Sequence, residues 1–138
     1  NRIHSIESED VCVCCAKLAS GGLGIIEAAV TLYPRNLEET LAVFGSHGTA
    51  VLSGTTLSKI KVWKFAHLSE EEAWNQAQAV NSTLDTTGHL AILEDFISSI
   101  INDHPPLVSG EEALGAVCLV ESIYRSMESG WPVSVKYL

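Results

Sequence analysis

The last third of the chain contains two stretches with the three- and four-residue apolar spacing of amphipathic helices, separated by Pro105 and Pro106. The apolar positions of the first are Leu90, Leu93, Phe96, Ile97, Ile100 and Ile101. Those of the second are Ala113, Ala116, Val117, Val120, Ile123, Tyr124 and Met127. This spacing places each set on one side of a helix. We therefore expect the apolar side of each helix to cover a surface formed elsewhere in the chain.

Capping residues set the expected ends of the helices. Ser109 with Glu112 matches the pattern in which a Ser at the N-cap and a Glu three residues later satisfy each other's backbone N–H groups. Gly130 is typical of the residue that follows a helix. A further short helix is predicted over residues 69–80, with Ser69 and Glu72 as its capping box. With Ser69 counted as the cap, the predicted helices span residues 70–129.

Upstream of the helices, short apolar runs alternate with turn residues, and each run is a predicted strand. The runs cover residues 10–20, 23–32, 37–44, 49–52 and 59–66. Strands joined by tight turns, such as the hairpin turn predicted at Gly21–Gly22, indicate an antiparallel sheet. A last strand is predicted over residues 133–137. The order of strands, helices and one strand predicts a single α+β domain over residues 1–138, with the helices packed on one face of the sheet.

Several of the predicted strands are apolar on both faces, as in Val11–Ala16 and Leu23–Ile26. An antiparallel sheet with one face in water would alternate apolar and polar residues. The helices can cover one face, and the other face needs a second subunit or a part of the protein outside this chain. The pattern predicts a homo-oligomer formed through a flat sheet face.

The composition excludes some classes of partner and compartment. A net charge of −9 argues against nucleic acid and anionic membranes, and no apolar run approaches the ~20 residues of a membrane span. Cys12, Cys14, Cys15 and Cys118 lack metal-site spacing and are expected to be buried free thiols. Free thiols and a polar, acidic N-terminal segment favour a cytoplasmic protein. Because the sequence starts at Asn1 and has no secretory feature, we expect it to be a piece of a longer chain.

Motifs of known catalytic chemistry are absent from the sequence. It has no G-x-G-x-x-G, P-loop, H-E-x-x-H or G-x-S-x-G pattern, and its five histidines are not paired at metal-ligand spacing. We therefore assign no catalytic residue and no metal ligand to this chain. His47 lies between Gly45 and Gly48, where turn geometry explains the glycines.

Two places are candidates for ligand binding. Tyr33, Arg35 and Asn36 follow a predicted strand and bring together a phenol, a guanidinium and an amide, which suit sugar hydroxyls or a carboxylate. An ordinary turn explains the same residues equally well. His89 begins a predicted helix, where free N–H groups attract anions, although spacing alone favours a partly buried structural histidine.

The C-terminal stretch resembles the end of the Gfo/Idh/MocA oxidoreductase family. The resemblance is carried by Gly88, His89, Asp95–Ile97, Ile100, Pro105–Val108, Gly110–Leu114, Ile123, Tyr124, Ser126, Gly130, Pro132 and Val133. Upstream, Glu7–Asp10, Ser20–Glu27 and Phe44–Ala50 have counterparts in the same order. Tyr33–Glu39 and Lys59–Phe65 are most similar to the UDP-N-acetylamino-sugar (uronate) 3-dehydrogenase branch.

This resemblance implies a fold and a function. The family joins an N-terminal Rossmann domain, which binds NAD or NADP, to a C-terminal α+β domain like that of glyceraldehyde-3-phosphate dehydrogenase, with an open, mostly antiparallel sheet. The sheet commonly forms the oligomer interface. The family's catalytic Lys lies in the Rossmann half, and its catalytic Asp/His helix lies before the segment that begins here.

The chain is thus expected to be a substrate-binding and oligomerisation domain that binds no cofactor itself and is inactive alone. In the full-length enzyme, a nucleotide-sugar hydroxyl would be oxidised by hydride transfer. Tyr33, Arg35, Asn36 and His89 are the residues expected to contact the sugar or nucleotide-sugar substrate. The alternative is a non-catalytic binding or assembly domain that reuses the same fold.

Overall fold

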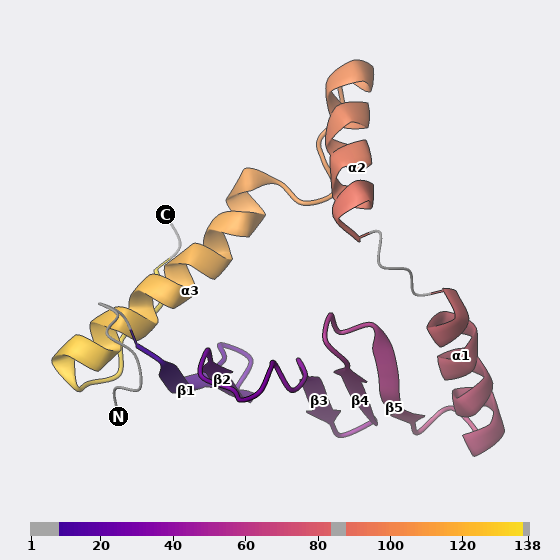
Figure 1. The fold of residues 1–138 in the computed structure, drawn as a ribbon, viewed down its shortest axis with the longest axis horizontal. Coiled ribbons are helices and arrows are strands. Elements are labelled where there is room, and N and C mark those ends of the chain that lie inside the picture. Colours follow the sequence, from indigo (N-terminus) through magenta and orange to yellow (C-terminus); the bar gives the residue numbers. More distant parts are fainter. Residues whose placement is uncertain (1–8, 84–87, 137–138) are drawn as a thin grey trace. The chain divides into compact units, whose positions relative to one another are not determined.

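The computed structural model describes residues 9–83 and 88–136, which form five strands and three helices (Figure 1). The strands are β1 (Val11–Lys17), β2 (Leu23–Ala29), β3 (Leu41–Gly45), β4 (Gly48–Ser53) and β5 (Lys59–Phe65). The helices are α1 (Glu70–Thr83), α2 (Gly88–Asn102) and α3 (Gly110–Ser129). The chain divides into two compact units, one built on β3–β5 and α1 and the other containing α2 and α3.

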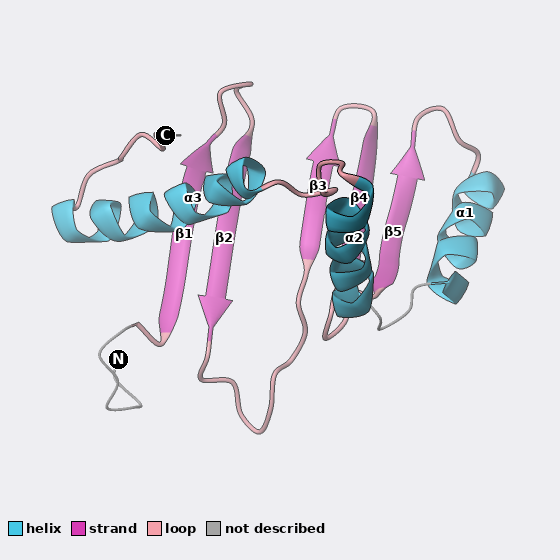
Figure 2. Cartoon of the chain, turned by 90° about the horizontal axis from the view of Figure 1, so that it is seen from above, coloured by secondary structure: helices cyan, strands magenta, loops and turns pink. Residues whose placement is uncertain are grey.

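β1 and β2 form a two-stranded hairpin in which the strands run in opposite directions (Figure 2). At the closed end the Leu18 N–H donates to the Gly22 carbonyl at 2.8 Å, and the Gly21 N–H donates to the Leu18 carbonyl at 2.9 Å. Gly21 has a φ of 91°, which residues with a Cβ rarely adopt. The turn predicted at Gly21–Gly22 is therefore confirmed.

The second sheet is antiparallel, with β4 in the centre and β3 and β5 on either side. Its register places Val43, Ala50 and Trp63 in one row across the strands. Ala42 and Val51 belong to the next row and therefore point to the opposite face. Both faces of this sheet thus carry apolar side chains, as the sequence predicts.

A glycine and an aromatic ring face each other where β4 begins. Gly48 pairs with Phe65 across the strands, and a Cβ on Gly48 would lie only 2.8 Å from Phe65 Cε1 and 2.9 Å from the Lys64 carbonyl oxygen. The ring thus occupies the space above the glycine. Trp63 packs edge-on against Phe65, with 4.8 Å between the ring centroids.

α1 covers the outer edge of β5. The Ile60 N–H donates to Asn81 Oδ1 at 2.7 Å, and Asn81 Nδ2 donates to the Ile60 carbonyl at 3.2 Å. One amide side chain therefore satisfies the same backbone groups that a further strand would satisfy, which blocks that edge. Trp63 Nε1 adds a bond of 3.1 Å to Gln76 Oε1.

The connection between α2 and α3 folds back onto the polar side of α2. α2 ends in a left-handed residue, Asp103 (φ 51°), and the His104 N–H donates to the Ser99 carbonyl at 3.1 Å. Further on, the Leu107 N–H donates to Asp95 Oδ2 at 2.9 Å. The only residue of α2 that is buried is Ser99, which lies on this polar side.

The ends of α3 agree with the predicted capping signals. The Ser109 side chain accepts from the Glu112 N–H, and the Glu112 side chain accepts from the Ser109 N–H. Gly130 caps the other end with a φ of 72°, and its N–H donates to the Ser126 carbonyl at 2.9 Å. Local sequence is sufficient to fix these boundaries.

Other predicted boundaries were wrong. β3 begins at Leu41 rather than at residue 37, because the Glu39 N–H donates to the Gly54 carbonyl and residues 37–40 lie outside the ladder. Residues 133–136 form no strand, because alternating apolar and polar residues do not by themselves supply a partner for the backbone. Tyr137, the last residue of the predicted strand, lies outside the described residues. α1 runs three residues beyond its predicted end, to Thr83, and residues 84–87 lie outside the described residues.

The cysteines are free thiols in different surroundings. Cys118 is buried, Cys12 and Cys14 are half-buried, and Cys15 is exposed. The prediction of buried thiols is correct for Cys118 alone. Cys14 and Cys15 differ because neighbours in a strand point to opposite faces.

The apolar face of α2 is more than half exposed along its length, for example at Leu90, Phe96 and Ile100. Free energy is gained when such a stripe is covered. The packing of α2 and α3 on a sheet face remains a prediction from the sequence.

The contact between Gly48 and Phe65 leads to a stability prediction. We expect Gly48→Ala to lower the free energy of unfolding by about 1–3 kcal/mol, because the new methyl group must displace the ring. Gly45→Ala is the control, since a Cβ there would meet only the Gly48 carbonyl oxygen, at 3.5 Å. Urea unfolding of both variants checks this, and equal losses would contradict it.

The start of α1 leads to a prediction about pH. The Ser69 N–H and Oγ both donate to Glu72 Oε2 at 2.8 Å, and these bonds hold the pKa of Glu72 below its ordinary value of 4.5. A carboxyl with a lowered pKa stabilises the folded state above its unfolded pKa, and that contribution is lost as the pH falls. In Glu72→Gln, α1 should therefore lose less protection from amide exchange between pH 5 and pH 3 than in the parent protein. Glu71→Gln should behave like the parent.

Candidate functional site

The candidate residues Tyr33, Arg35 and Asn36 lie together in the connection between β2 and β3, so the structure places these three close in the chain and in space. The Tyr33–Pro34 peptide bond is cis. Tyr33 is 96% exposed, and the other two side chains are also exposed. We call residues 33–36 the YPRN turn.

Two contacts join the segment after the YPRN turn to the three-stranded sheet. The Glu39 N–H donates to the Gly54 carbonyl at 2.9 Å, and Lys61 Nζ lies 3.9 Å from Glu38 Oε1. These contacts therefore fix the chain two to three residues after Asn36, while the side chains of the YPRN turn remain accessible. Loops held in this way on a rigid sheet commonly carry binding residues.

The chemistry of the YPRN turn suits binding rather than acid–base catalysis. Arg35 offers five N–H donors and a permanent positive charge, and it forms no ion pair with any carboxylate in residues 9–83 and 88–136. Tyr33 and Asn36 can both donate and accept hydrogen bonds. Such a set can hold an anionic group together with neighbouring hydroxyl groups.

His89 is the second residue of α2 and is exposed. The first turn of a helix leaves backbone N–H groups without intrahelical partners, and these can donate to an anion. His89 belongs to the unit that contains α2 and α3, whereas the YPRN turn belongs to the unit of β3–β5. The structure therefore supports the YPRN turn as one group and leaves His89 as a separate candidate.

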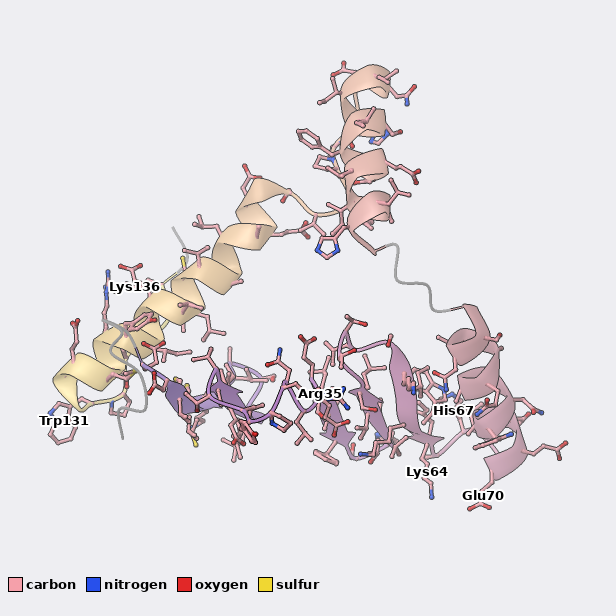
Figure 3. All side chains as sticks on the ribbon, in the orientation of Figure 1. Arg35, Lys64, His67, Glu70, Trp131 and Lys136 are labelled. Carbon is pink, nitrogen blue, oxygen red and sulfur yellow. The ribbon has the colours of Figure 1, made fainter. Side chains whose placement is uncertain are left out.

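A depression of about 380 Å³ lies at the end of the three-stranded sheet away from the contacts that hold the YPRN turn, between the turn from β3 to β4 and the start of α1. His47, Lys64 and Glu70 are among its lining residues, and Lys64 and Glu70 can be followed with the nearby His67 in Figure 3. Ser46 Oγ lies 2.9 Å from His47 Nδ1. Sequence reasoning missed this depression, although the glycines around His47 marked the turn that forms it.

The depression does not have the arrangement of a hydrolytic site. Ser46 and His47 are adjacent in one turn, and among the described residues no carboxylate is bonded to the His47 ring to orient it. In the described part of the chain, no three His, Cys, Asp or Glu side chains are grouped so that they could hold a metal ion.

The described elements do not fit a dinucleotide cofactor. Both sheets are antiparallel hairpins or meanders, and a Rossmann site requires parallel strands linked by a helix and a glycine-rich turn. Within the described residues, no helix has the length and apolar character needed to cross a bilayer.

The structure is similar to those of two dehydrogenases solved in complex with NADH and UDP-GlcNAcA. The first is the WlbA dehydrogenase from Bordetella pertussis in complex with NADH and UDP-GlcNAcA, with a TM-score of 0.86 and 27% identity. The second is WlbA from Chromobacterium violaceum in complex with the same two molecules, with a TM-score of 0.80 and 24% identity. They match over 98% and 96% of this chain, which spans 40% and 37% of theirs.

A comparison with curated protein sequences gave no match. A family model does match, over residues 2–135, and it describes the C-terminal alpha/beta domain of an oxidoreductase family. This match covers nearly the whole chain and agrees with the α+β architecture of five strands and three helices. The chain belongs to the Gfo/Idh/MocA oxidoreductase family, of which it is the C-terminal α/β domain.

Proposed function

We propose that the chain is the substrate-binding and oligomerisation domain of an NAD(P)-dependent oxidoreductase that acts on a nucleotide sugar. The observation that carries this proposal is the TM-score of 0.86, over 98% of the chain, to a dehydrogenase in complex with NADH and UDP-GlcNAcA. The chain spans 40% of that protein, so turnover requires the longer polypeptide.

The role of this chain is to hold the sugar substrate. Arg35 binds an anionic group of the nucleotide sugar, and Tyr33 and Asn36 bind neighbouring hydroxyl groups. His89 is a separate candidate for a contact with the substrate. The nicotinamide, bound by a domain outside this chain, supplies the hydride acceptor. No residue here is assigned to proton transfer, and the chain alone is inactive.

The second role is assembly into a homo-oligomer through a sheet face. One face of the β1–β2 hairpin carries Val11, Val13, Leu23 and Ile25 together with Lys17 and Glu27, and Ile25 is 77% exposed. In the other sheet Phe44 is 78% exposed. An apolar surface of this kind gains free energy when a second copy covers it. Free thiols at all four cysteines favour a cytoplasmic location.

The substrate role is tested with Arg35→Met in the full-length enzyme. Loss of a charge-assisted hydrogen bond to an anionic group should weaken UDP-GlcNAcA binding about 10- to 100-fold. Calorimetric titration of the substrate and steady-state kinetics with NAD measure this. Lys64→Met is the control, because Lys64 lies at the other end of β5 and lines the depression described above.

The outcomes separate the enzyme from an assembly domain that reuses this fold. Weaker binding in Arg35→Met, with Lys64→Met unchanged, supports the substrate role. Equal affinity in both variants contradicts the role of the YPRN turn. A full-length protein that neither binds nor oxidises any nucleotide sugar in a panel would point to the non-catalytic alternative.

The assembly role predicts a concentration-dependent oligomer that a charge on the sheet face disrupts. Ile25→Glu should shift the protein toward the monomer in sedimentation velocity runs across micromolar concentrations, because an unpaired carboxylate would be buried in the interface. Leu107→Glu is the control, since Leu107 is also highly exposed but lies between α2 and α3. A parent protein that is monomeric throughout this range would exclude the assembly role.

A further inference from the structure

β5 contains one residue more than its partner strand requires. The register shifts between Val51 and Leu52 of β4: Val51 pairs with Val62, whereas Leu52 pairs with Ile60. Lys61 is the extra residue and stands in a β-bulge. A bulge bends a strand and changes the direction of a side chain, and bulges are frequent beside binding sites.

Asn81 holds the strand immediately before this bulge. Its side-chain amide bonds both the N–H and the carbonyl of Ile60, at 2.7 and 3.2 Å, across 21 residues of sequence. The two bonds fix the backbone of Ile60 from the side opposite β4. The conformation of the bulge is thus set on one side by the sheet and on the other by α1.

The bulged Lys61 points to the segment that follows the YPRN turn. Its Nζ lies 3.9 Å from Glu38 Oε1, and the next residue, Glu39, donates its N–H to Gly54 beyond the end of β4. These are the contacts that attach the YPRN turn to the three-stranded sheet. The chain of contacts therefore runs from Asn81 through Ile60 and Lys61 to Glu38.

We propose that Lys61 and Asn81 are positioning residues for the YPRN turn: Asn81 fixes the bulge in β5, and the bulged Lys61 holds Glu38 so that Arg35 and Asn36 are presented in one arrangement. The consequence for substrate affinity rests on the proposed function. Neither Lys61 nor Asn81 needs to touch the substrate.

The expected effects differ in size for the two residues. Both side chains of the Lys61–Glu38 pair are well exposed, at 60% and 40%, and exposed pairs contribute little. The contribution of Lys61 is to limit the conformations of the turn before the ligand binds, which improves affinity by preorganisation. Loss of Asn81 leaves two partly buried backbone groups of Ile60 unpaired, so its larger effect should be on β5 itself, and its effect on the turn passes through Lys61.

Hydrogen–deuterium exchange on the full-length protein tests the proposal without any ligand. In Lys61→Met, exchange of the segment 33–40 should rise about two- to fivefold. Asn81→Ala acts on this segment through Lys61, so it should raise that exchange by up to the same factor and should in addition raise exchange at Ile60. Lys64→Met and Asn75→Ala are matched controls, on the same strand and the same helix, and should leave this segment unchanged. The exchanged pair Lys61→Glu with Glu38→Lys should restore the parent rate.

UDP-GlcNAcA affinity and kinetics are measured on the same variants. Lys61→Met should raise KM and leave kcat unchanged, because a smaller fraction of the protein holds the turn in the binding arrangement before the substrate arrives. Parent-like exchange in Lys61→Met, or a charge-exchanged pair that fails to restore it, overturns the proposal. So does unchanged affinity in Lys61→Met when Arg35→Met binds weakly. If Arg35→Met also binds normally while exchange responds as expected, the substrate role has failed and the positioning of the turn stands.

Discussion

The antiparallel pairing of β4 with both of its neighbours is the constraint on which the larger unit depends. Because β4 is central, its backbone groups are used on both sides, and its register decides which residues of β3 and β5 face each other. The position of Gly48 opposite Phe65 follows from this register, as does the bulge at Lys61. A shift of one residue would move every side chain of a strand to the other face.

The same pairing places a rigid support beside an exposed turn. The YPRN turn has no regular structure of its own, yet the residues just after it are bonded to the end of β4 and paired with a side chain of β5. The rigid three-stranded sheet and the YPRN turn, which carries the candidate binding side chains, are therefore separate in sequence and connected by few contacts. This division is common in proteins whose sites lie on loops.

The chain also exposes many large apolar side chains on its sheets and helices. The sheets carry apolar side chains on both faces, and α2 folds its polar side, at Asp95 and Ser99, against its own C-terminal connection while its apolar side stays accessible. The proposed assembly with other copies, or a longer polypeptide, would cover such surface. The family assignment and the pattern of exposure are consistent on this point.

The sequence by itself determined what depends on near neighbours: the helix ends at Ser109 and Gly130 and the hairpin turn at Gly21. It also determined the family, because the family's motifs occur in order along the chain. Tertiary structure decided what depends on residues far apart. Asn81 reaches Ile60, and the bulge at Lys61 arises from pairing with β4, neither of which any local pattern encodes. The strand expected near the C-terminus did not form over residues 133–136 because a strand exists only where another backbone pairs with it.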